Sequence, residues 1–130
     1  MKKKFIVSAV VPVYNGSPYI KETIDSLLHQ KRKFDEIIVV DDGSTDSTLE
    51  ILGAIRGIKI IRSHHAERSA ARNTGWKESK GNIIAFIESD SVFDQNWLAE
   101  VLKGFEGHYE AVIDRRGLYK PTTFIAKMND

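Results

Sequence analysis

The chain has 130 residues, a length typical of one domain and sufficient to bury a hydrophobic core. Its 19 lysine and arginine residues balance 18 aspartate and glutamate residues, so the charge gives no reason to expect nucleic acid as a partner. The absence of cysteine excludes disulfides, thiolate metal sites and a cysteine nucleophile, and it fits a reducing cytoplasm, with the inner face of the membrane as a second location. No apolar stretch approaches the ~20 residues that cross a bilayer.

Strand-like and helix-like segments alternate along the chain. Apolar runs of β-prone residues predict the strands Phe5–Val11, Glu36–Val40, Ile58–Ile61 and Asn82–Ile87, with Ala111–Ile113 as a weaker candidate. Helical spacing of apolar residues, or cap residues before them, predicts helices that start at Ser17-Pro18, at Ser44, at Arg68 and after an Asp94 cap. Gly75 argues against the third of these helices, and the pattern from Pro121 to Asp130 is unclear.

This alternation predicts an α/β fold, a three-layer Rossmann-like sheet that is mostly parallel and wound by right-handed crossovers. We expect the strand order 3-2-1-4, in which the chain reverses direction across the sheet between the first and fourth strands. Ligands in such sheets bind beyond the carboxyl ends of the strands at this reversal. The residues that directly follow the strands are therefore the candidate functional residues.

Three of the expected strands end in unusual residues. They lead into Pro12-Val13-Tyr14-Asn15-Gly16, into Asp41-Asp42-Gly43-Ser44-Thr45-Asp46 and into Glu88-Ser89-Asp90-Ser91. Five carboxylates would then meet near one crevice, where repulsion raises pKa values unless cations or hydrogen-bond donors compensate. Instead of a functional role at the crevice, Asp42 and Asp46 could stabilise the turn or cap the following helix. We assign this structural role to Asp46. Asp41 is different because it sits directly on a buried strand.

Glu88 and Asp90 are two residues apart, so in an extended segment they would face the same side. A carboxylate pair with an open face suits Mg²⁺ or Mn²⁺ that also takes phosphate oxygens, although a solvated strand end is the alternative. Tyr14 is either a stacking plate for a base or a rim aromatic that packs on the first helix. Arg68 and Arg72 could bind phosphates, and Arg72 could equally pair with one of the acids.

The segments VSAVVPVYNG, EIIVVDDGSTDSTLEIL and SAARNTGWKESKGNIIAFIESDS stand in this order between residues 5 and 105. Together they resemble the nucleotide-binding half of glycosyltransferase family 2, the inverting enzymes with the GT-A fold. The resemblance implies that the chain binds a nucleoside-diphosphate sugar, with a UDP-sugar favoured, together with Mg²⁺ or Mn²⁺. The partner would be a saccharide or lipid-linked acceptor, whose hydroxyl receives the sugar. No dinucleotide fingerprint or Walker A loop competes with this interpretation.

The resemblance also implies roles for individual residues. Tyr14 falls where the family places an aromatic against the base, and Asp41 or Asp42 falls at the acid that contacts the base or ribose. Asp90 falls at the last acid of the Asp-x-Asp motif, and Arg72 falls in a stretch that lines the cleft. The nucleotide-sugar-binding candidates are Pro12, Val13, Tyr14, Asn15, Asp41, Asp42, Arg72, Asn73, Glu88 and Ser89, and the metal candidates are Asp90 and Glu88.

The sequence departs from the family pattern at three points. Glu88 replaces the first Asp of Asp-x-Asp, and the charged segment from His64 to Ser69 replaces an Asn-Gly-Gly run. The general base of an inverting transfer lies in the second half of the family's domain, whereas only 40 residues follow Asp90 and Asp114 matches no motif. We therefore expect residues 1–130 to form one truncated GT-A-like domain with the acceptor-binding half largely absent, unless a second copy supplies that wall.

Two other functions stay open at this point. The chain could be a non-catalytic module or fragment that binds a nucleotide sugar without transferring it. More remotely, its length and its acids suggest a receiver-like phospho-acceptor signalling domain, although the acid pair of such domains follows the first strand rather than the second.

Overall fold

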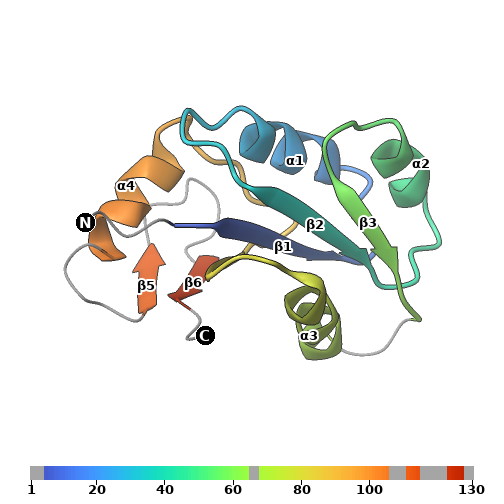
Figure 1. The fold of residues 1–130 in the computed structure, drawn as a ribbon. Coiled ribbons are helices and arrows are strands. Elements are labelled where there is room, and N and C mark those ends of the chain that lie inside the picture. The colour runs from blue at the N-terminus through green and yellow to red at the C-terminus, as the bar shows by residue number, and fades with distance from the viewer. Residues whose placement is uncertain (1–4, 65–67, 106–110, 115–122, 128–130) are drawn as a thin grey trace.

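The computed structural model describes residues 5–64, 68–105, 111–114 and 123–127. In these ranges one sheet is covered by helices on both faces (Figure 1). The strands are β1 (Val7–Val13), β2 (Glu36–Asp41), β3 (Lys59–Arg62), β4 (Ile83–Phe86), β5 (Ala111–Asp114) and β6 (Thr123–Lys127). The helices are α1 (Ile20–Leu28), α2 (Thr48–Gly53), α3 (Arg68–Glu78) and α4 (Trp97–Phe105).

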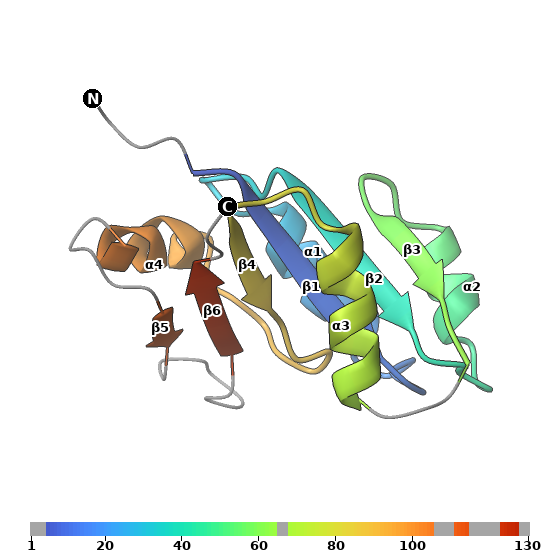
Figure 2. The same ribbon diagram turned by 60° about the horizontal axis from the view of Figure 1, so that its bottom comes forward.

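The sheet has the strand order β3-β2-β1-β4-β6-β5. The pairs β1–β2, β2–β3 and β1–β4 are parallel, which confirms the predicted order of the first four strands and the reversal between β1 and β4. Strand β6 pairs antiparallel with both β4 and β5 (Figure 2). The sequence did not predict β6, because its apolar run is only three residues long and is flanked by polar residues.

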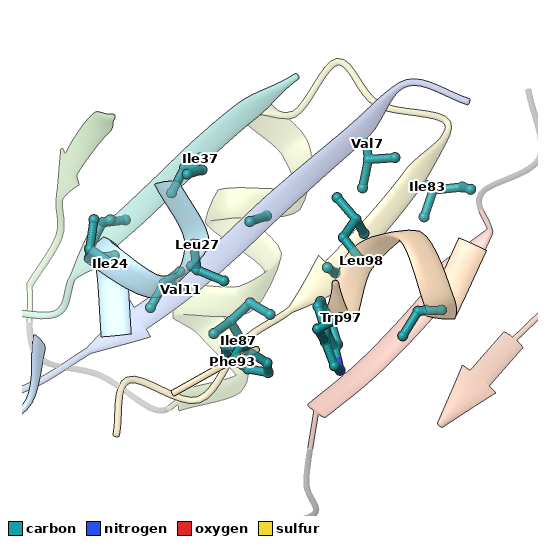
Figure 3. Close-up of a cluster of buried hydrophobic side chains, with 14 of the residues drawn as sticks. Val7, Val11, Ile24, Leu27, Ile37, Ile83, Ile87, Phe93, Trp97 and Leu98 are labelled. Carbon is teal, nitrogen blue, oxygen red and sulfur yellow. The ribbon is translucent and has the colours of Figure 1, made fainter. Parts of the chain in front are cut away.

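Strand alternation divides the core between the two faces of the sheet. One face carries a large cluster that joins β1, β2 and β4 to α1, α2 and α4 (Figure 3). The other face carries a small cluster in which Ile38 and Val40 of β2 pack against Ala71 of α3. Among the described helices, α3 is the one on this face of the sheet, and its first turns lie beside the carboxyl ends of β1, β2 and β4 (Figure 2).

Gly75 is present inside α3 because the helix packs very close to the sheet. A Cβ atom at this position would lie under 3.0 Å from Val10 Cγ1 and 3.2 Å from Val40 Cγ2. Glycine costs about 1 kcal/mol of helix propensity relative to alanine, and the close contact explains why the helix nevertheless contains it. The predicted third helix is thus correct, and the residue that argued against it marks its contact with the sheet.

Strand β1 continues two residues beyond its predicted end and includes Pro12. The carbonyl of Val10 accepts a hydrogen bond from Ile87 N on the β4 side, and Pro12 faces that same side. The β1–β4 ladder ends at Val10 and Phe86, so the missing N–H of Pro12 removes no ladder hydrogen bond.

Two of the predicted helix starts differ from the structure. Helix α1 begins at Ile20 rather than at Ser17, and the carbonyl of Gly16 accepts from the amides of Tyr19 and Ile20. Helix α2 begins at Thr48 rather than at Ser44, because the segment between them bonds to the loop after β1.

The first turn of α4 is held by a side chain from the loop after α1, in addition to the contacts of Asp94. The fully buried Gln30 accepts from Leu98 N at 2.9 Å and donates to Asp94 O at 2.6 Å. The Asp94 carboxylate accepts from Asn96 N, which precedes the helix. One buried amide side chain therefore fixes the loop after α1 to the first turn of α4.

Candidate functional site

The carboxyl ends of β1, β2 and β4 lie together at the topological switch point between β1 and β4. The three polar clusters that the sequence singled out follow these three strands, so the structure brings them to the same edge of the sheet, as predicted. Ligands of open α/β sheets bind at such an edge.

Asp41 and Asp42 point to opposite faces of the sheet. The β1–β2–β3 ladder continues past Asp41, because Asp42 N donates to Val13 O at 2.9 Å and Ser63 N donates to Asp41 O at 2.8 Å. Alternation therefore gives Asp41 the face of α1 and α2, and gives Asp42 the face of α3.

The environments of the two carboxylates differ accordingly. Asp41 is fully buried, its Oδ1 accepts from the Ser44 hydroxyl, and its Oδ2 is buried without a hydrogen-bond partner among the described residues. Asp42 is 5% exposed, and its Oδ1 accepts from the Ser63 hydroxyl at 3.0 Å. Asp41 thus shapes the loop after β2, and Asp42 faces the side of the sheet on which α3 lies.

Arg72 of α3 pairs with Glu88, which follows β4. Arg72 Nη2 lies 3.2 Å from Glu88 Oε1, and the two side chains are 39% and 15% exposed. The Nε of Arg72 is buried and has no hydrogen-bond partner in the described part of the chain. Of the two roles that the sequence left open for Arg72, pairing with an acid is confirmed, and part of its guanidinium still reaches solvent.

Glu88 and Asp90 do not lie on an extended segment, which corrects the geometry assumed from their spacing. Ser91 N donates to Glu88 O at 3.2 Å, so residues 88–91 form a tight turn and the two-residue alternation of a strand does not apply. The hydroxyl of Thr23, a buried residue of α1, donates to Ser89 O at 2.8 Å within this turn.

The loop after β1 is built around Asn15 and Tyr14. Asn15 has φ of 50°, in the left-handed region that asparagine tolerates, and its Oδ1 accepts from Thr45 N at 2.7 Å. Tyr14 is 44% exposed. It directly follows Val13, whose carbonyl accepts a hydrogen bond from the backbone N–H of Asp42. Asn15 therefore holds the neighbouring loop, and Tyr14 presents a large aromatic surface close to Asp42.

Asp46 makes the turn contacts at the start of α2 that the sequence predicted, although the N-cap residue itself is Ser47. Its Oδ1 accepts from Thr48 N at 2.9 Å and from the Thr48 hydroxyl. The hydrogen bond from the Thr48 side chain is the main cause that lowers the pKa of Asp46 to about 2. At Asp46 the hydrogen-bond donors thus outweigh desolvation, which alone would raise the pKa.

The other candidate residues lie around this centre with different exposures. Val13 is buried in the core cluster, so only its backbone faces the edge of the sheet, and Pro12 lies within β1. Asn73 is exposed on α3. The side chain of Arg68, the structure of His65 and the side chain of Asp114 lie outside what the structure describes.

The sequence interpretation missed Thr23, Thr48 and Ser63 as supports of the site. A usable signal existed for Thr23, because it lies three residues after Ile20 and four before Leu27, on the apolar stripe of α1. A hydroxyl group on a buried stripe must find an acceptor, and here the acceptor is the Ser89 carbonyl.

A groove of about 420 Å³ lies elsewhere, between α1 and α2. Its lining residues are Lys21, Asp25, Leu28, Ile51, Ala54, Ile55 and Arg56. None of them follows β1, β2 or β4. Within the described ranges, no helix is long and apolar enough to span a membrane.

Comparison with known proteins identifies the family. The sequence pattern described as Glycosyl transferase family 2 matches residues 8–130. The chain belongs to this family. Membership confirms the resemblance and sets aside the receiver-like alternative.

Curated relatives from bacteria agree with this assignment. The glycosyltransferase GlyA of Streptococcus pneumoniae is 38% identical over 101 residues, which are 75% of this chain and 14% of GlyA. The uncharacterized glycosyltransferase EpsJ of Bacillus subtilis is 36% identical over 129 residues, which are 89% of this chain and 38% of EpsJ. The chain therefore spans well under half the length of these two relatives.

Solved structures with the GT-A fold are similar to this chain. The structure of S. aureus TarS 1-349 in complex with UDP-GlcNAc has a TM-score of 0.76 and 29% identity, covering 84% of this chain and 34% of that chain. The Pyrobaculum calidifontis mannosyltransferase PcManGT, solved in complex with GDP-Man and Mn²⁺, has a TM-score of 0.77 at 22% identity, covering 96% of this chain and 45% of that protein. At this lower identity PcManGT shows the fold alone. The predicted mostly parallel α/β fold of GT-A type is thus confirmed.

Proposed function

We propose that this chain forms the donor-binding part of a glycosyltransferase that transfers a sugar from a nucleoside-diphosphate sugar to an acceptor hydroxyl with inversion. The observation that carries the proposal is the arrangement on the α3 side of the switch point. There Asp42 supplies a buried carboxylate acceptor and Arg72 supplies a partly exposed guanidinium. A nucleoside diphosphate needs both, because its base and ribose carry hydrogen-bond donors and its diphosphate is anionic.

We assign the nucleoside contact to Asp42 rather than to Asp41. Asp42 lies on the face that also carries Arg72 and Glu88, and the Ser63 hydroxyl holds one of its oxygens. Asp41 is directed to the opposite face, where it holds Ser44. The exposed ring of Tyr14 provides a surface for stacking of the base next to Asp42. A UDP-sugar is favoured, because the S. aureus TarS structures with UDP and UDP-GlcNAc are 29–30% identical to this chain.

Arg72 would bind the diphosphate and stabilise the charge that develops on it as the sugar leaves. Its guanidinium can share its donors between Glu88 and a phosphate oxygen, since Nη2 is the atom that contacts Glu88 and the side chain is 39% exposed. No residue among those described is assigned as the general base. We expect the acceptor to be a saccharide or a lipid-linked saccharide. Residues outside this site would have to bind it.

The turn after β4 fits a divalent cation such as Mg²⁺ or Mn²⁺. Asp90 and Glu88 offer carboxylate oxygens, and in the described part of the chain no group of three His, Cys, Asp or Glu side chains could hold a metal by itself. This donor set suits an ion that takes one or two carboxylates and completes its shell with phosphate oxygens and water. When bound, such an ion neutralises charge on the diphosphate.

Calorimetric titration with UDP in the presence of Mn²⁺ tests the proposal. We expect binding by the parent chain, and affinity reduced by at least about tenfold in Asp42→Asn and Asp90→Ala, a change of about 1.4 kcal/mol. Asp25→Ala is the matched control, because Asp25 forms an exposed ion pair with Lys21 on α1. Absence of metal-dependent binding, or an Asp90→Ala chain that binds like the parent, would refute the proposal.

A second experiment separates the transferase from a non-catalytic binding module. The purified chain is incubated with UDP-sugars and a panel of saccharide acceptors, and products are detected by mass spectrometry. Product formation would rule out the module. Binding without any product is expected both for the module and for a donor-binding part that lacks its acceptor wall.

A further inference from the structure

Three consecutive backbone amides after β1 each donate to a side chain of the segment that runs from the end of β2 to the first residue of α2. The donors and acceptors are Asn15 N to Ser44 Oγ at 2.9 Å, Gly16 N to Thr48 Oγ1 at 2.9 Å, and Ser17 N to Asp46 Oδ2 at 3.2 Å. We call Ser44, Asp46 and Thr48 the clasp. The backbone amides of a surface loop usually donate to water. Here three successive amides donate to protein side chains, which indicates that the loop backbone is held in one conformation.

The contact also runs in the opposite direction. Asn15 Oδ1 accepts from Thr45 N at 2.7 Å and from Asp46 N at 3.3 Å. Asn15 adopts its positive φ of 50° within this contact. The loop after β1 and the segment before α2 are thus bound to each other through backbone groups on both sides.

Asp46 connects the two segments through one carboxylate. Its Oδ1 accepts from Thr48, the first residue of α2, and its Oδ2 accepts from the Ser17 amide. The start of a helix needs only the first of these contacts. The second contact joins the start of α2 to the loop that begins with the exposed Tyr14 and runs beside Asp42.

We propose that Asp46 is a positioning residue for the nucleoside end of the donor site. As part of the clasp, it fixes the loop that carries Tyr14 relative to Asp42. This inference rests on the proposed function. A loop that is ordered before the ligand arrives does not have to be ordered during binding, so the clasp increases affinity for the nucleoside without touching it. Arg72 lies in α3 and Asp90 lies in the turn after β4, so we expect the diphosphate end of the site to depend less on the clasp than the nucleoside end does.

The test compares Asp46→Ala, Asp46→Asn and the control Asp25→Ala with the parent chain. Two ligands are titrated in the presence of Mn²⁺, UDP and inorganic diphosphate, and amide exchange of Asn15, Gly16 and Ser17 is followed by NMR. For Asp46→Ala we expect faster exchange of the three amides and about tenfold weaker binding of UDP, equivalent to about 1.4 kcal/mol. Binding of inorganic diphosphate should change by less than about twofold.

Asp46→Asn keeps one acceptor oxygen and should recover part of the UDP affinity, while Asp25→Ala should match the parent. Equal losses for UDP and diphosphate in Asp46→Ala would show a general structural role and overturn the inference. Unchanged amide exchange or unchanged UDP affinity would overturn it as well. If the three amides respond as expected but the parent binds no UDP, the clasp exists, whereas the proposed donor site fails and the positioning role fails with it.

Discussion

Replacing Gly75 by alanine should force α3 away from the sheet. The new Cβ would lie under 3.0 Å from Val10 Cγ1 and 3.2 Å from Val40 Cγ2, whereas carbon atoms prefer separations of about 3.5–4.0 Å. Val10 and Val40 are fully buried and β-branched, so neither side chain can rotate away at low cost. The helix or the strand must therefore move by more than about 0.5 Å.

The size of the effect follows from two opposing terms. Overpacking of a core destabilises by about 1–3 kcal/mol, and the better helix propensity of alanine offsets up to about 1 kcal/mol of this. We expect the free energy of unfolding to fall by about 1–2 kcal/mol and Tm to fall by about 3–10 °C for a chain of this length. Gly53→Ala is the matched control: it lies in α2 with nothing within 4 Å of its Cβ, and should be neutral or slightly stabilising.

Urea denaturation of both variants, alone and in a Val10→Ala background, measures the effect. Val10→Ala removes the methyl group that the new Cβ meets, so Gly75→Ala should cost less in that background than in the parent. Equal stability of the Gly75→Ala and Gly53→Ala chains would refute the reasoning. The same cost of Gly75→Ala in both backgrounds would show that Val10 is not the obstacle.

Three further predictions concern the site. Thr23→Val leaves the Ser89 carbonyl without its donor. The free energy of unfolding, measured by urea denaturation, should therefore fall by about 1–3 kcal/mol, and UDP binding should weaken. Thr23→Ser keeps the hydroxyl and should behave like the parent. Arg72→Ala should weaken calorimetric binding of UDP by about tenfold but leave binding of uridine, which has no diphosphate, unchanged; equal losses for both ligands would contradict the assignment. The pKa of Asp46 is lowered from 3.8 to about 2, so its stabilising contribution is complete above about pH 4 and is lost as the pH falls through 2. The difference in unfolding free energy between the parent and Asp46→Asn should therefore shrink from pH 4 to pH 2, and a difference that stays constant would contradict this account.

The architecture of the first four strands was predictable, because hydrophobic runs and helical spacing are local patterns. Their alternation, together with the handedness of crossovers, determines the strand order and places the candidate residues at one edge of the sheet. The strand β6 was not predictable in this way. Its residues form a strand by pairing with β4 and β5, and no pattern within five residues encodes those partners.

The candidate site was predictable in its residue types but not in its contacts. The sequence left open whether Arg72 binds a phosphate or an acid, since only the packing of α3 brings it within 3.2 Å of Glu88. The spacing of Glu88 and Asp90 suggested an extended pair, whereas the backbone closes into a turn there. The turn role of Asp46 at the start of α2 was correctly predicted, but its second contact comes from a residue 29 positions away.

The central claim is that a nucleoside diphosphate binds at the switch point between β1 and β4. The most direct measurement is an NMR titration of the ¹⁵N-labelled chain with UDP and Mg²⁺, in which the perturbed amides are mapped onto the structure. The account predicts that the largest shifts occur in the segments that follow β1, β2 and β4, around Tyr14, Asp42 and Asp90. Absence of shifts at saturating UDP, or shifts confined to the groove between α1 and α2, would contradict it.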